Sequence, residues 1–453
     1  MPGVFIKTYG CQMNERDSEQ VAAMFLSGGY ELADAPEQAD VVLINTCSVR
    51  EKAELKALGK MGMLCAEQTE RPHVVFGFMG CMSQSKGREL FREVPRLDIV
   101  TGTRQYHNVF SLCHNLLQKR LAEGRTEPRR KGAHICEVSE SPGFQNEIRD
   151  HLPRRESCTA FVSIMQGCEM RCSYCIVPYT RGSECSRPAE DILREVRELV
   201  DSGVKEVTLL GQIVNRYGKD EPAVNGRGAF VRLLEKLHDI DGLMRIRFTS
   251  PHPIGFRHDL VQAYTYLPKL ASHIHFPMQS GSDRILQLMR RPYKNEKYIA
   301  LCEAMREARP DLAITTDIIV GVPGETDEDY LLTKAAVERI QFDNAFIFQY
   351  SPRRGTPAAL MEEQICLRVK EERNHDLLET VNRIATARNH ALVGTRQTIL
   401  VEGDSKTNAT RLQGRTSQNK PVIIEKDGVT KAGDIVPVLI RECSSFTLYG
   451  EVV

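Results

Sequence analysis

The chain of 453 residues has no excess of positive or negative charge, and it lacks a long apolar run. Lys+Arg and Asp+Glu number 60 each, so the protein does not coat nucleic acid by bulk charge, and any such binding must use local patches. No apolar run approaches the ~18 residues that a membrane-spanning helix needs. The first residues lack the basic region and apolar stretch of a secretory signal. We therefore expect a cytoplasmic protein without membrane segments.

Cysteine, by contrast, is frequent, with 14 residues. Disulfide frameworks belong to short secreted chains, a class that the length and the missing signal argue against. Thiolate-held metal is therefore the first interpretation of these cysteines. Apolar residues make up 41% and charged residues 26% of the chain, which is typical of a globular protein, and the length suggests about three domains.

Residues 1–118 alternate short apolar strands with helices. The strands are expected at Val4–Tyr9, Val41–Asn45, Val74–Met79 and Asp98–Thr101. This alternation predicts a doubly wound parallel α/β domain, with helices on both faces of the sheet. Residues 119–157 are interpreted as a linker. Its segment Lys119–Lys131 holds six basic and two acidic residues, which is typical of a solvated linker or, alternatively, of a contact to backbone phosphates.

Residues 158–388 contain six further β/α units, with strands expected at Phe161–Met165, Glu206–Leu210, Arg245–Thr249, His273–Phe276, Ala313–Val320 and Ala345–Tyr350. Six units predict an open or partial (β/α)6 barrel, smaller than the usual eight-unit form. Residues 389–453 change to short alternating strands separated by glycines, at Thr398–Val401, Val422–Glu425, Ile435–Ile440 and Phe446–Val452. That pattern predicts a small all-β barrel or sandwich.

The strongest motif is Gly167–Cys175, GCEMRCSYC, in which Cys168, Cys172 and Cys175 form C-x3-C-x2-C. Three thiolates on one tight loop can each bind one iron of a cubane cluster. The fourth iron then keeps an open position, as catalytic metal sites do. A zinc site is the alternative, but it needs a fourth ligand. Cys185 is the candidate for it, because no His or Cys pair follows at finger spacing.

This motif, placed after the first strand of a β/α barrel, resembles the radical S-adenosylmethionine (SAM) superfamily. The resemblance implies a [4Fe–4S] cluster whose open iron chelates the amino and carboxylate groups of SAM. Electron transfer from that cluster then cleaves SAM to a 5′-deoxyadenosyl radical.

A second set of cysteines is scattered along the chain. Cys11, Cys47 and Cys81 each follow a predicted strand, in VFIKTYGC, VVLINTC and VVFGFMGC. Parallel strands place their carboxyl ends at one edge of a sheet, where doubly wound folds bind ligands. Three thiolates at that edge can hold a second cluster with one open iron. The alternative is ordinary half-buried cysteines, which suits any one of them better than all three at the same structural position.

Together, the two sets resemble the methylthiotransferases of the radical SAM superfamily over nearly the whole chain. That family combines an N-terminal three-cysteine domain, a radical SAM core and a C-terminal RNA-binding TRAM barrel. The local segments TYGCQMNERDSE (8–19), NTCSVREKAE (45–54), GFMGCMSQ (77–84) and CIVPYTRG (175–182) are most similar to the branch that modifies isopentenyladenosine in tRNA. The departures from the family pattern are Gln166, Ile213, Arg354 and Cys185. None of them removes a cluster ligand.

The resemblance implies an enzyme that transfers a methylthio group to carbon 2 of N(6)-isopentenyladenosine beside the anticodon of tRNA. It implies two 4Fe–4S clusters and SAM as cofactors, with the cluster of Cys11, Cys47 and Cys81 carrying the sulfur. The implied partners are the tRNA anticodon stem-loop, an electron donor such as a flavodoxin or ferredoxin, and a protein that supplies sulfur or iron–sulfur clusters. A monomer is expected. The alternatives are the sister branches that act on threonylcarbamoyl-adenosine or on a ribosomal protein and, more remotely, a non-catalytic redox-sensing RNA-binding protein.

Further contacts are expected at the loops after the barrel strands and in the C-terminal barrel. Arg291 is expected at the SAM carboxylate, and Gly321 and Gly324 of DIIVGVPGET are expected to allow close approach to adenine. Arg411, Arg415 and Lys420 are expected at tRNA phosphates, with Phe446 or Tyr449 as a stacking face, and ordinary surface charge is the alternative. The complete set expected at SAM is Tyr174, Gly211, Gln212, Asn215, Gln279, Ser280, Arg291, Gly321 and Gly324.

Overall fold

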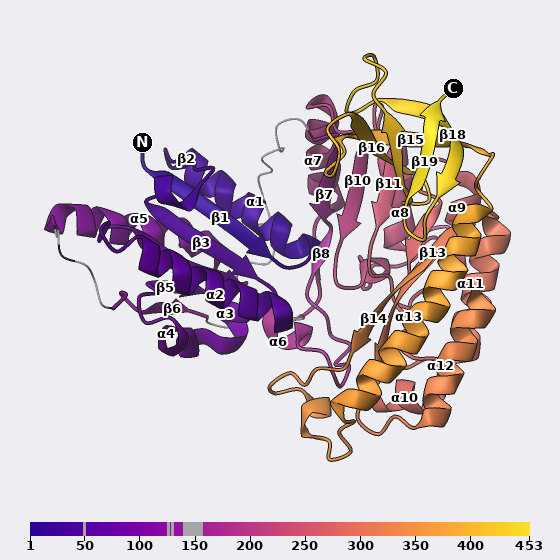
Figure 1. Ribbon diagram of the computed structural model, residues 1–453, viewed down its shortest axis with the longest axis horizontal. Helices are drawn as coiled ribbons and strands as arrows, with labels where there is room; N and C mark the ends of the chain where they lie inside the picture. Colours follow the sequence, from indigo (N-terminus) through magenta and orange to yellow (C-terminus); the bar gives the residue numbers. More distant parts are fainter. Residues whose placement is uncertain (49–50, 125–126, 128–130, 139–156) are drawn as a thin grey trace. The chain divides into compact units, whose positions relative to one another are not determined.

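The structure is a computed structural model that describes residues 1–48, 51–124, 127, 131–138 and 157–453. It forms two compact units (Figure 1). The N-terminal unit comprises Met1–Leu152, Gln166–Glu169 and Cys175–Arg187, and the C-terminal unit comprises Pro153–Met165, Met170–Tyr174 and Pro188–Val453. The chain passes between the units within the C-x3-C-x2-C segment, so Cys168 and Cys175 belong to the first unit and Cys172 to the second.

The N-terminal unit is built on a six-stranded parallel sheet with strand order β2-β1-β3-β4-β5-β6. The strands are β1 (Gly3–Tyr9), β2 (Glu31–Leu32), β3 (Val41–Thr46), β4 (Val75–Gly80), β5 (Ile99–Thr101) and β6 (Ile135–Glu137). The helices are α1 (Gln12–Ser27), α2 (Glu51–Glu67), α3 (Cys81–Lys86), α4 (Leu90–Glu93) and α5 (Tyr106–Glu123).

Both faces of this sheet are buried, because β3 and β4 are apolar at nearly every position and send alternate side chains to opposite sides. Ile44 and Phe76 pack with α2, whereas Leu43 and Val75 pack with α1 and α5. The expected doubly wound α/β domain is therefore confirmed.

The interpretation of residues 119–157 as a linker is wrong for its described parts. Helix α5 runs to Glu123, and β6 joins the sheet beside β5. Arg120, read as part of a solvated basic run, is buried and forms an ion pair with Asp98. This ion pair could not be predicted from the basic segment itself, because Asp98, the acidic partner of Arg120, lies outside that segment. Residues 125–126, 128–130 and 139–156 lie outside the described residues.

The C-terminal unit contains the six expected parallel strands as two three-stranded sheets, β11-β10-β7 and β12-β13-β14. A bridge between Ile246 and Leu270 connects them. The strands are β7 (Thr159–Ser163), β10 (Glu206–Leu210), β11 (Arg245–Phe248), β12 (His273–His275), β13 (Ala313–Val320) and β14 (Asn344–Gln349). The helices are α7 (Ala189–Asp201), α8 (Ala229–His238), α9 (His258–Tyr266), α10 (Asp283–Leu288), α11 (Asn295–Ala308), α12 (Asp327–Ile340) and α13 (Leu367–His390). The prediction of a partial (β/α)6 barrel is confirmed.

Three short elements lie in the segment that the two units share. They are β8 (Met165–Gln166), α6 (Val177–Arg181) and β9 (Cys185–Ser186). Helix α6 therefore begins two residues after Cys175, the last cysteine of the motif, and belongs to the N-terminal unit.

The chain ends in a small closed barrel with strand order β15-β16-β17-β19-β18, drawn in yellow tones in Figure 1. The strands are β15 (Arg396–Asp404), β16 (Arg411–Thr416), β17 (Pro421–Glu425), β18 (Ile435–Cys443) and β19 (Leu448–Val452). The small barrel is as predicted, but β16 is not among the expected strands, because only one apolar side chain, Leu412, marks its inner face. Gly414 occupies the next inward position, where a Cβ would lie 2.6 Å from the Leu400 carbonyl oxygen.

Buried charges attach this barrel to the six-stranded part of its unit. Arg247 of β11 donates to the carbonyl oxygens of Thr416 (2.8 Å) and Ser417 (2.9 Å). Glu206 of β10 balances its charge, with 2.8 Å between the Arg247 Nε and the carboxylate. Because Arg247, Glu206 and Thr416 are buried, these bonds fix where the barrel begins its second hairpin. Within the described part of the chain, no helix is long and apolar enough to span a membrane.

We predict that Gly80→Ala destabilises the N-terminal unit by about 3 kcal/mol, combining backbone strain with overpacking. Gly80 ends β4 with φ +100°, and a Cβ there would lie 2.2 Å from Asn45 Oδ1 and 2.8 Å from the Thr46 carbonyl oxygen. Urea denaturation followed by fluorescence and circular dichroism measures the loss.

Gly29→Ala is the matched control for this substitution. Gly29 also has positive φ (+81°), but a Cβ there would meet no atom within 4 Å. Only the conformational cost of about 1 kcal/mol applies. Equal losses in the two variants would contradict the close packing at the end of β4.

Candidate functional site

Cys11, Cys47 and Cys81 lie at one edge of the N-terminal sheet, directly after the ends of β1, β3 and β4. The three strands are neighbours whose ends are in register. The Cys47 amide donates to the carbonyl oxygen of Tyr9 (3.0 Å), the last residue of β1. The Cys11 and Cys47 side chains form a hydrogen bond. Their predicted convergence at one edge is confirmed, whereas their role as cluster ligands stays a prediction.

Two buried asparagines fix the loop that carries Cys11. Asn14 donates from Nδ2 to Asn45 Oδ1 (3.0 Å), and Asn45 donates back to the Asn14 carbonyl oxygen (2.9 Å) and to Ser18 Oγ (3.0 Å). The Cys11 thiol donates to Asn14 Oδ1 (3.4 Å). A Cβ at Gly10 would lie 2.4 Å from that oxygen, so only glycine lets the loop approach the amide so closely.

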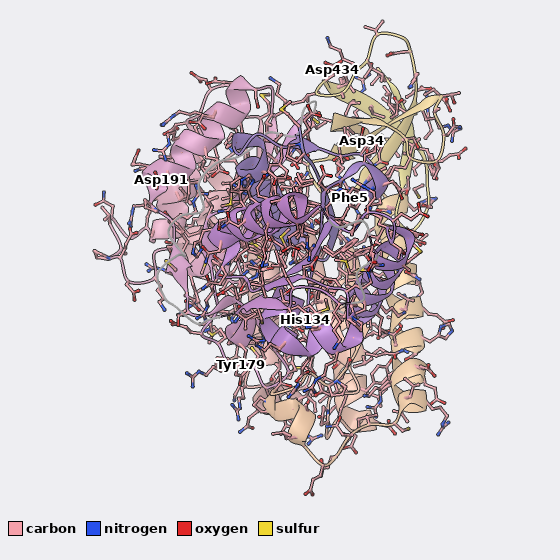
Figure 2. All side chains as sticks on the ribbon, turned by 90° about the vertical axis from the view of Figure 1, so that its left-hand side faces the viewer. Phe5, Asp34, His134, Tyr179, Asp191 and Asp434 are labelled. Atoms are coloured by element: carbon pink, nitrogen blue, oxygen red, sulfur yellow. The ribbon has the colours of Figure 1, made fainter. Side chains whose placement is uncertain are left out.

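A buried positive charge lies among these cysteines. Arg181, at the end of α6, forms an ion pair with Asp17 of α1 (Nη2–Oδ2 2.6 Å) and a hydrogen bond with Cys81. Tyr179, two residues earlier on α6, instead lies at the surface with 57% of its area exposed (Figure 2). The short helix therefore directs Arg181 inward. Asp17 and Arg181 lie within the segments TYGCQMNERDSE and CIVPYTRG, but the sequence alone suggests no role for either residue.

This environment shifts the pKa values of the Cys11 and Cys81 thiols in opposite directions. The hydrogen bond from Cys47 lowers the pKa of Cys11 to about 6, against the effect of burial and with help from the charge of Arg181. Burial raises the pKa of Cys81, and Arg181 offsets part of that increase. A thiolate is the form that binds iron, so the positive charge favours the state of these side chains that binds metal.

The residues at this edge fit an iron–sulfur cluster. Thiolates are the ligands that such clusters require. The Ser48 and Ser83 hydroxyl oxygens, beside Cys47 and Cys81 in sequence, are buried without a hydrogen-bond partner among the described residues. Buried hydroxyls normally have a partner, and the sulfides of a cluster accept such bonds. In the described ranges, no three His, Cys, Asp or Glu side chains share a single-ion site. A cubane does not need such a site, because each cysteine binds a different iron.

The C-x3-C-x2-C segment is held on each side by backbone bonds within its own unit. In the N-terminal unit, Cys168 donates from its amide to the Gly182 carbonyl oxygen (2.9 Å). Gly167, with φ +85°, precedes it where a Cβ would lie 1.9 Å from the Ser183 carbonyl oxygen. In the C-terminal unit, Ser173 donates its amide to the Met289 carbonyl oxygen (3.0 Å). These contacts fix each part of the loop within its own unit.

Arg291 in the C-terminal unit is buried beside Cys172. Its Nη1 lies 3.8 Å from the Cys172 sulfur, its Nε donates to the Tyr293 hydroxyl (3.2 Å) and its Nη2 to the Pro277 carbonyl oxygen (3.2 Å). The structure thus places this guanidinium at a cysteine thiol. Its expected contact with the SAM carboxylate stays a prediction.

Several residues expected at SAM have structural roles in the C-terminal unit. Asn215 exchanges hydrogen bonds of 2.8 Å with the backbone of His252. The Ser280 hydroxyl lies 3.2 Å from Thr333 Oγ1 and accepts from the Ser282 amide (3.2 Å). Their polar atoms therefore hold turns of the backbone. Gln279 is buried with φ +69°, and Gly211 lies tightly against Met165. Gln212 follows Gly211 and is partly exposed, and Tyr174 packs against the apolar cluster that includes Tyr350.

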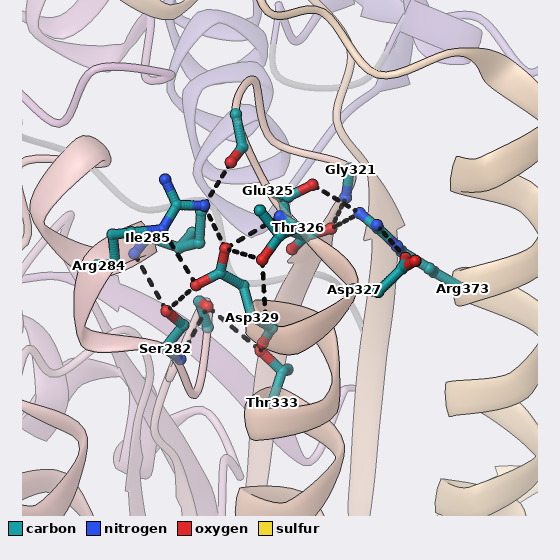
Figure 3. Close-up of polar contacts among 12 residues, drawn as sticks. Ser282, Arg284, Ile285, Gly321, Glu325, Thr326, Asp327, Asp329, Thr333 and Arg373 are labelled. Atoms are coloured by element: carbon teal, nitrogen blue, oxygen red, sulfur yellow. Dashed lines mark hydrogen bonds and ion pairs between the residues drawn. The ribbon is translucent and has the colours of Figure 1, made fainter.

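The glycine-rich stretch after β13 is held by a buried carboxylate. Glu325 Oε2 accepts the Gly321 amide (2.7 Å) and Arg373 Nη1 (2.7 Å), as Figure 3 shows. Gly321 and Gly324 both have positive φ, +70° and +79°. The next turn is fixed by Asp329, whose pKa is lowered, despite burial, by hydrogen bonds from Arg284 and Ser282. These hydrogen bonds fix the backbone of the stretch, and its expected contact with adenine stays a prediction.

The residues expected at RNA separate into two groups. Arg411 and Arg415 lie on the surface of β16, each beside an acidic residue, Glu425 (2.7 Å) and Glu402 (3.0 Å). Phe446 is 51% exposed. Lys420 is instead buried, with Nζ 3.0 Å from Asp343 Oδ1 and 2.7 Å from Asn389 Oδ1. Lys420 is a structural residue in this fold, and we do not retain it among the RNA contacts.

Comparison with known proteins finds three family models that match successive segments of the chain. The model of Uncharacterized protein family UPF0004 matches residues 3–102, that of the radical SAM superfamily residues 162–335, and that of the TRAM domain residues 390–453. The chain is 64% identical over 452 residues to the tRNA-2-methylthio-N(6)-dimethylallyladenosine synthase of Akkermansia muciniphila, covering 99% of this chain and 98% of that protein. Identity to the protein of the same name from Methylacidiphilum infernorum is 48%, covering 99% and 94%.

Solved structures share the fold at low sequence identity. The radical SAM methyltransferase TsrM from Kitasatospora setae superposes with a TM-score of 0.58 at 13% identity, covering 86% of this chain and 90% of that one. The cobalamin-dependent SAM radical enzyme OxsB gives a TM-score of 0.52 at 12% identity, covering 85% and 58%. At this identity the likeness supports the fold alone.

We predict that Lys420→Met lowers the free energy of unfolding of the C-terminal unit by about 2–3 kcal/mol. Breaking a buried pair costs about 3–5 kcal/mol, and Arg388, at 2.8 Å from Asp343, compensates in part. Affinity for a tRNA anticodon stem-loop should stay within about twofold, because the residue is not on the surface. Chemical denaturation and filter binding measure the two effects.

Lys426→Met is the control, since Lys426 pairs with Asp404 at the surface (2.8 Å) and such pairs contribute less than about 1 kcal/mol. A loss of RNA affinity in Lys420→Met without a loss of stability would contradict the structural role.

Proposed function

Because the chain belongs to the tRNA-2-methylthio-N(6)-dimethylallyladenosine synthases, we propose that its six motif cysteines hold two [4Fe–4S] clusters. Cys168, Cys172 and Cys175 would hold the cluster that binds SAM. Cys11, Cys47 and Cys81 would hold the cluster that carries sulfur. The protein is a radical SAM tRNA methylthiotransferase whose product is 2-methylthio-N(6)-isopentenyladenosine. The observation that carries the residue assignment is the common sheet edge of Cys11, Cys47 and Cys81.

The chemistry of the reaction explains why two sets of cluster-binding cysteines are needed. Carbon 2 of the adenine ring bears an unactivated C–H bond, and the ring offers no good electrophile to a thiolate. When bound, the clusters and SAM supply radical hydrogen abstraction, a methyl group and sulfur. The chain's own residues bind these groups, orient them and exclude water.

The C-terminal unit contributes to the SAM side in three ways. Arg291 places a positive charge beside the sulfur of Cys172, where it would face a ligand of the proposed cluster. Gly321 and Gly324 leave two positions of the loop after β13 without a side chain, which suits close approach of adenine. Tyr174, Gly211, Gln212 and Gln279 remain proposed SAM neighbours, whereas Asn215 and Ser280 act by holding the turns beside them.

The C-terminal barrel is proposed to bind the tRNA substrate. Arg411 and Arg415 lie on one strand, β16, and Phe446 offers an exposed aromatic face. Among the described residues of the barrel, this combination of cations and aromatic surface suits phosphate contact and base stacking. Both arginines are partly neutralised by neighbouring acids, so each should contribute less to affinity, and to its salt dependence, than an unpaired cation would.

The chemistry also requires partners that supply electrons and sulfur. Reductive SAM cleavage consumes one electron, which suits a low-potential donor such as a flavodoxin or ferredoxin. Each product removes sulfur from the protein, so a sulfur or iron–sulfur supply protein must renew it. We propose that the protein acts in the cytoplasm, where its tRNA substrate and such partners would be available, and that it acts as a monomer.

Single cysteine substitutions test whether the two sets of cysteines have the separate roles proposed for them. Cys172→Ala should abolish SAM cleavage and leave about four irons per chain in the N-terminal set. Cys47→Ala should keep SAM cleavage and stop methylthio transfer. Iron analysis, 5′-deoxyadenosine formation and nucleoside mass spectrometry on isopentenylated tRNA measure the three quantities.

Cys366→Ala is the control, because Cys366 is exposed and belongs to neither set. It should retain about eight irons and full product formation. If Cys172→Ala and Cys47→Ala both still made product, the two-cluster assignment would be wrong.

A further inference from the structure

Arg181 is a fixed positive charge inside the N-terminal unit, with 2% of its surface exposed. It lies six residues after Cys175, and α6 carries it to the edge formed by Cys11, Cys47 and Cys81. Both terminal nitrogens meet the Asp17 carboxylate, Nη1 to Oδ1 at 3.2 Å and Nη2 to Oδ2 at 2.6 Å. Such fork-to-fork geometry holds a guanidinium in one orientation.

A third side chain stabilises the ion pair of Arg181 and Asp17. Tyr106, at the start of α5, donates its hydroxyl to Asp17 Oδ2 at 2.9 Å. Burial, with the charge of Asp17, raises the pKa of Tyr106 well above its ordinary value, so the hydroxyl remains a donor. Asp17 raises the pKa of Arg181 well above its ordinary value despite burial. Tyr106 and Arg181 therefore remain hydrogen-bond donors to the Asp17 carboxylate.

The guanidinium acts on two of the three cysteines. It forms a hydrogen bond with Cys81 and interacts electrostatically with Cys11. A comparable arrangement recurs in the other unit, where buried Arg291 lies against Cys172. Each three-cysteine set thus has one buried arginine at one of its thiols.

We propose that Arg181 sets the reduction potential of the N-terminal cluster, with Asp17 moderating its charge and Tyr106 holding the pair. The proposal rests on the assignment of Cys11, Cys47 and Cys81 as cluster ligands. Reduction adds a negative charge to a buried anionic cluster, and a nearby cation stabilises that reduced state. A hydrogen bond to a ligand sulfur acts in the same direction. Arg181 therefore raises the potential, and Asp17 lowers it.

The test uses the full chain with Cys168, Cys172 and Cys175 replaced by alanine, so that only the N-terminal set can hold a cluster. After anaerobic reconstitution, iron content is measured first, and the midpoint potential follows from a redox titration monitored by electron paramagnetic resonance. In this background, Arg181→Met should lower the equilibrium constant for reduction at least tenfold, which is about 59 mV for a one-electron couple.

The sign of the shift separates an electrostatic role from a structural one. Asp17→Asn keeps the shape of the side chain but removes the opposing charge, so the potential should shift in the positive direction. Arg181→Lys keeps the charge without the fork and should shift less than Arg181→Met. Tyr106→Phe changes no charge and should leave the potential within error. The double variant Arg181→Met/Asp17→Asn leaves no lone buried charge, and it should shift negatively by less than Arg181→Met alone.

Unchanged potentials in Arg181→Met and Asp17→Asn at full iron content would overturn the proposal, as would shifts of the same sign. Should Arg181→Met not fold, opposite shifts in Asp17→Asn and the double variant support the proposal, and their absence overturns it. Failure of the background chain itself to bind iron, with Arg181 intact, would instead refute the ligand assignment.

Discussion

The constraint on which the N-terminal unit depends is the common direction of its strands. Because β1, β3 and β4 run parallel and in register, the residues that follow them must emerge at one edge. Cysteines that are far apart in sequence thereby become neighbours without any loop built for the purpose. The ends of these strands approach one another closely because glycines precede Cys11 and Cys81. The hydrogen bond between the Asn14 and Asn45 side chains stabilises the same edge.

Buried charge is the second organising feature, and in several places it joins elements that are distant in the chain. Arg120 of α5 pairs with Asp98 directly before β5, Arg247 of β11 pairs with Glu206 of β10, and Lys420 pairs with Asp343. Desolvating a charge is expensive unless a partner and further hydrogen bonds compensate it. Each such pair therefore favours one arrangement of the elements that it connects. The pair of Arg181 and Asp17 differs in one respect, because it also contacts a proposed cluster ligand.

Sequence reasoning was strongest where a single local pattern decides the outcome. The runs VVLIN and VFGFM are apolar at successive positions, so strands buried on both faces follow directly. The sheet edge shared by Cys11, Cys47 and Cys81 needed only the additional rule that parallel strands end together. Strands β6 and β16 were missed because each is short or polar and gains its stability from a neighbour rather than from its own pattern.

Side-chain partners were the part that sequence could not supply. Arg181 and Asp17 are 164 residues apart, and nothing in their local sequence pairs them. Lys420 lies in a stretch without acidic residues and therefore suggested phosphate contact, yet its partner Asp343 comes from a different part of the fold. Asn215 and Ser280 were placed in the correct loops, but which of their atoms are already bonded depends on the folded backbone.

The central claim is that one chain holds two cubane clusters and uses both. The most direct measurement is Mössbauer spectroscopy of the 57Fe-reconstituted protein, followed by turnover of the same sample with reductant, SAM and isopentenylated tRNA. The account predicts about eight irons per chain, all in cubane clusters, and formation of 2-methylthio-N(6)-isopentenyladenosine. About four irons per chain with full product formation, or bound zinc without SAM cleavage, would contradict it.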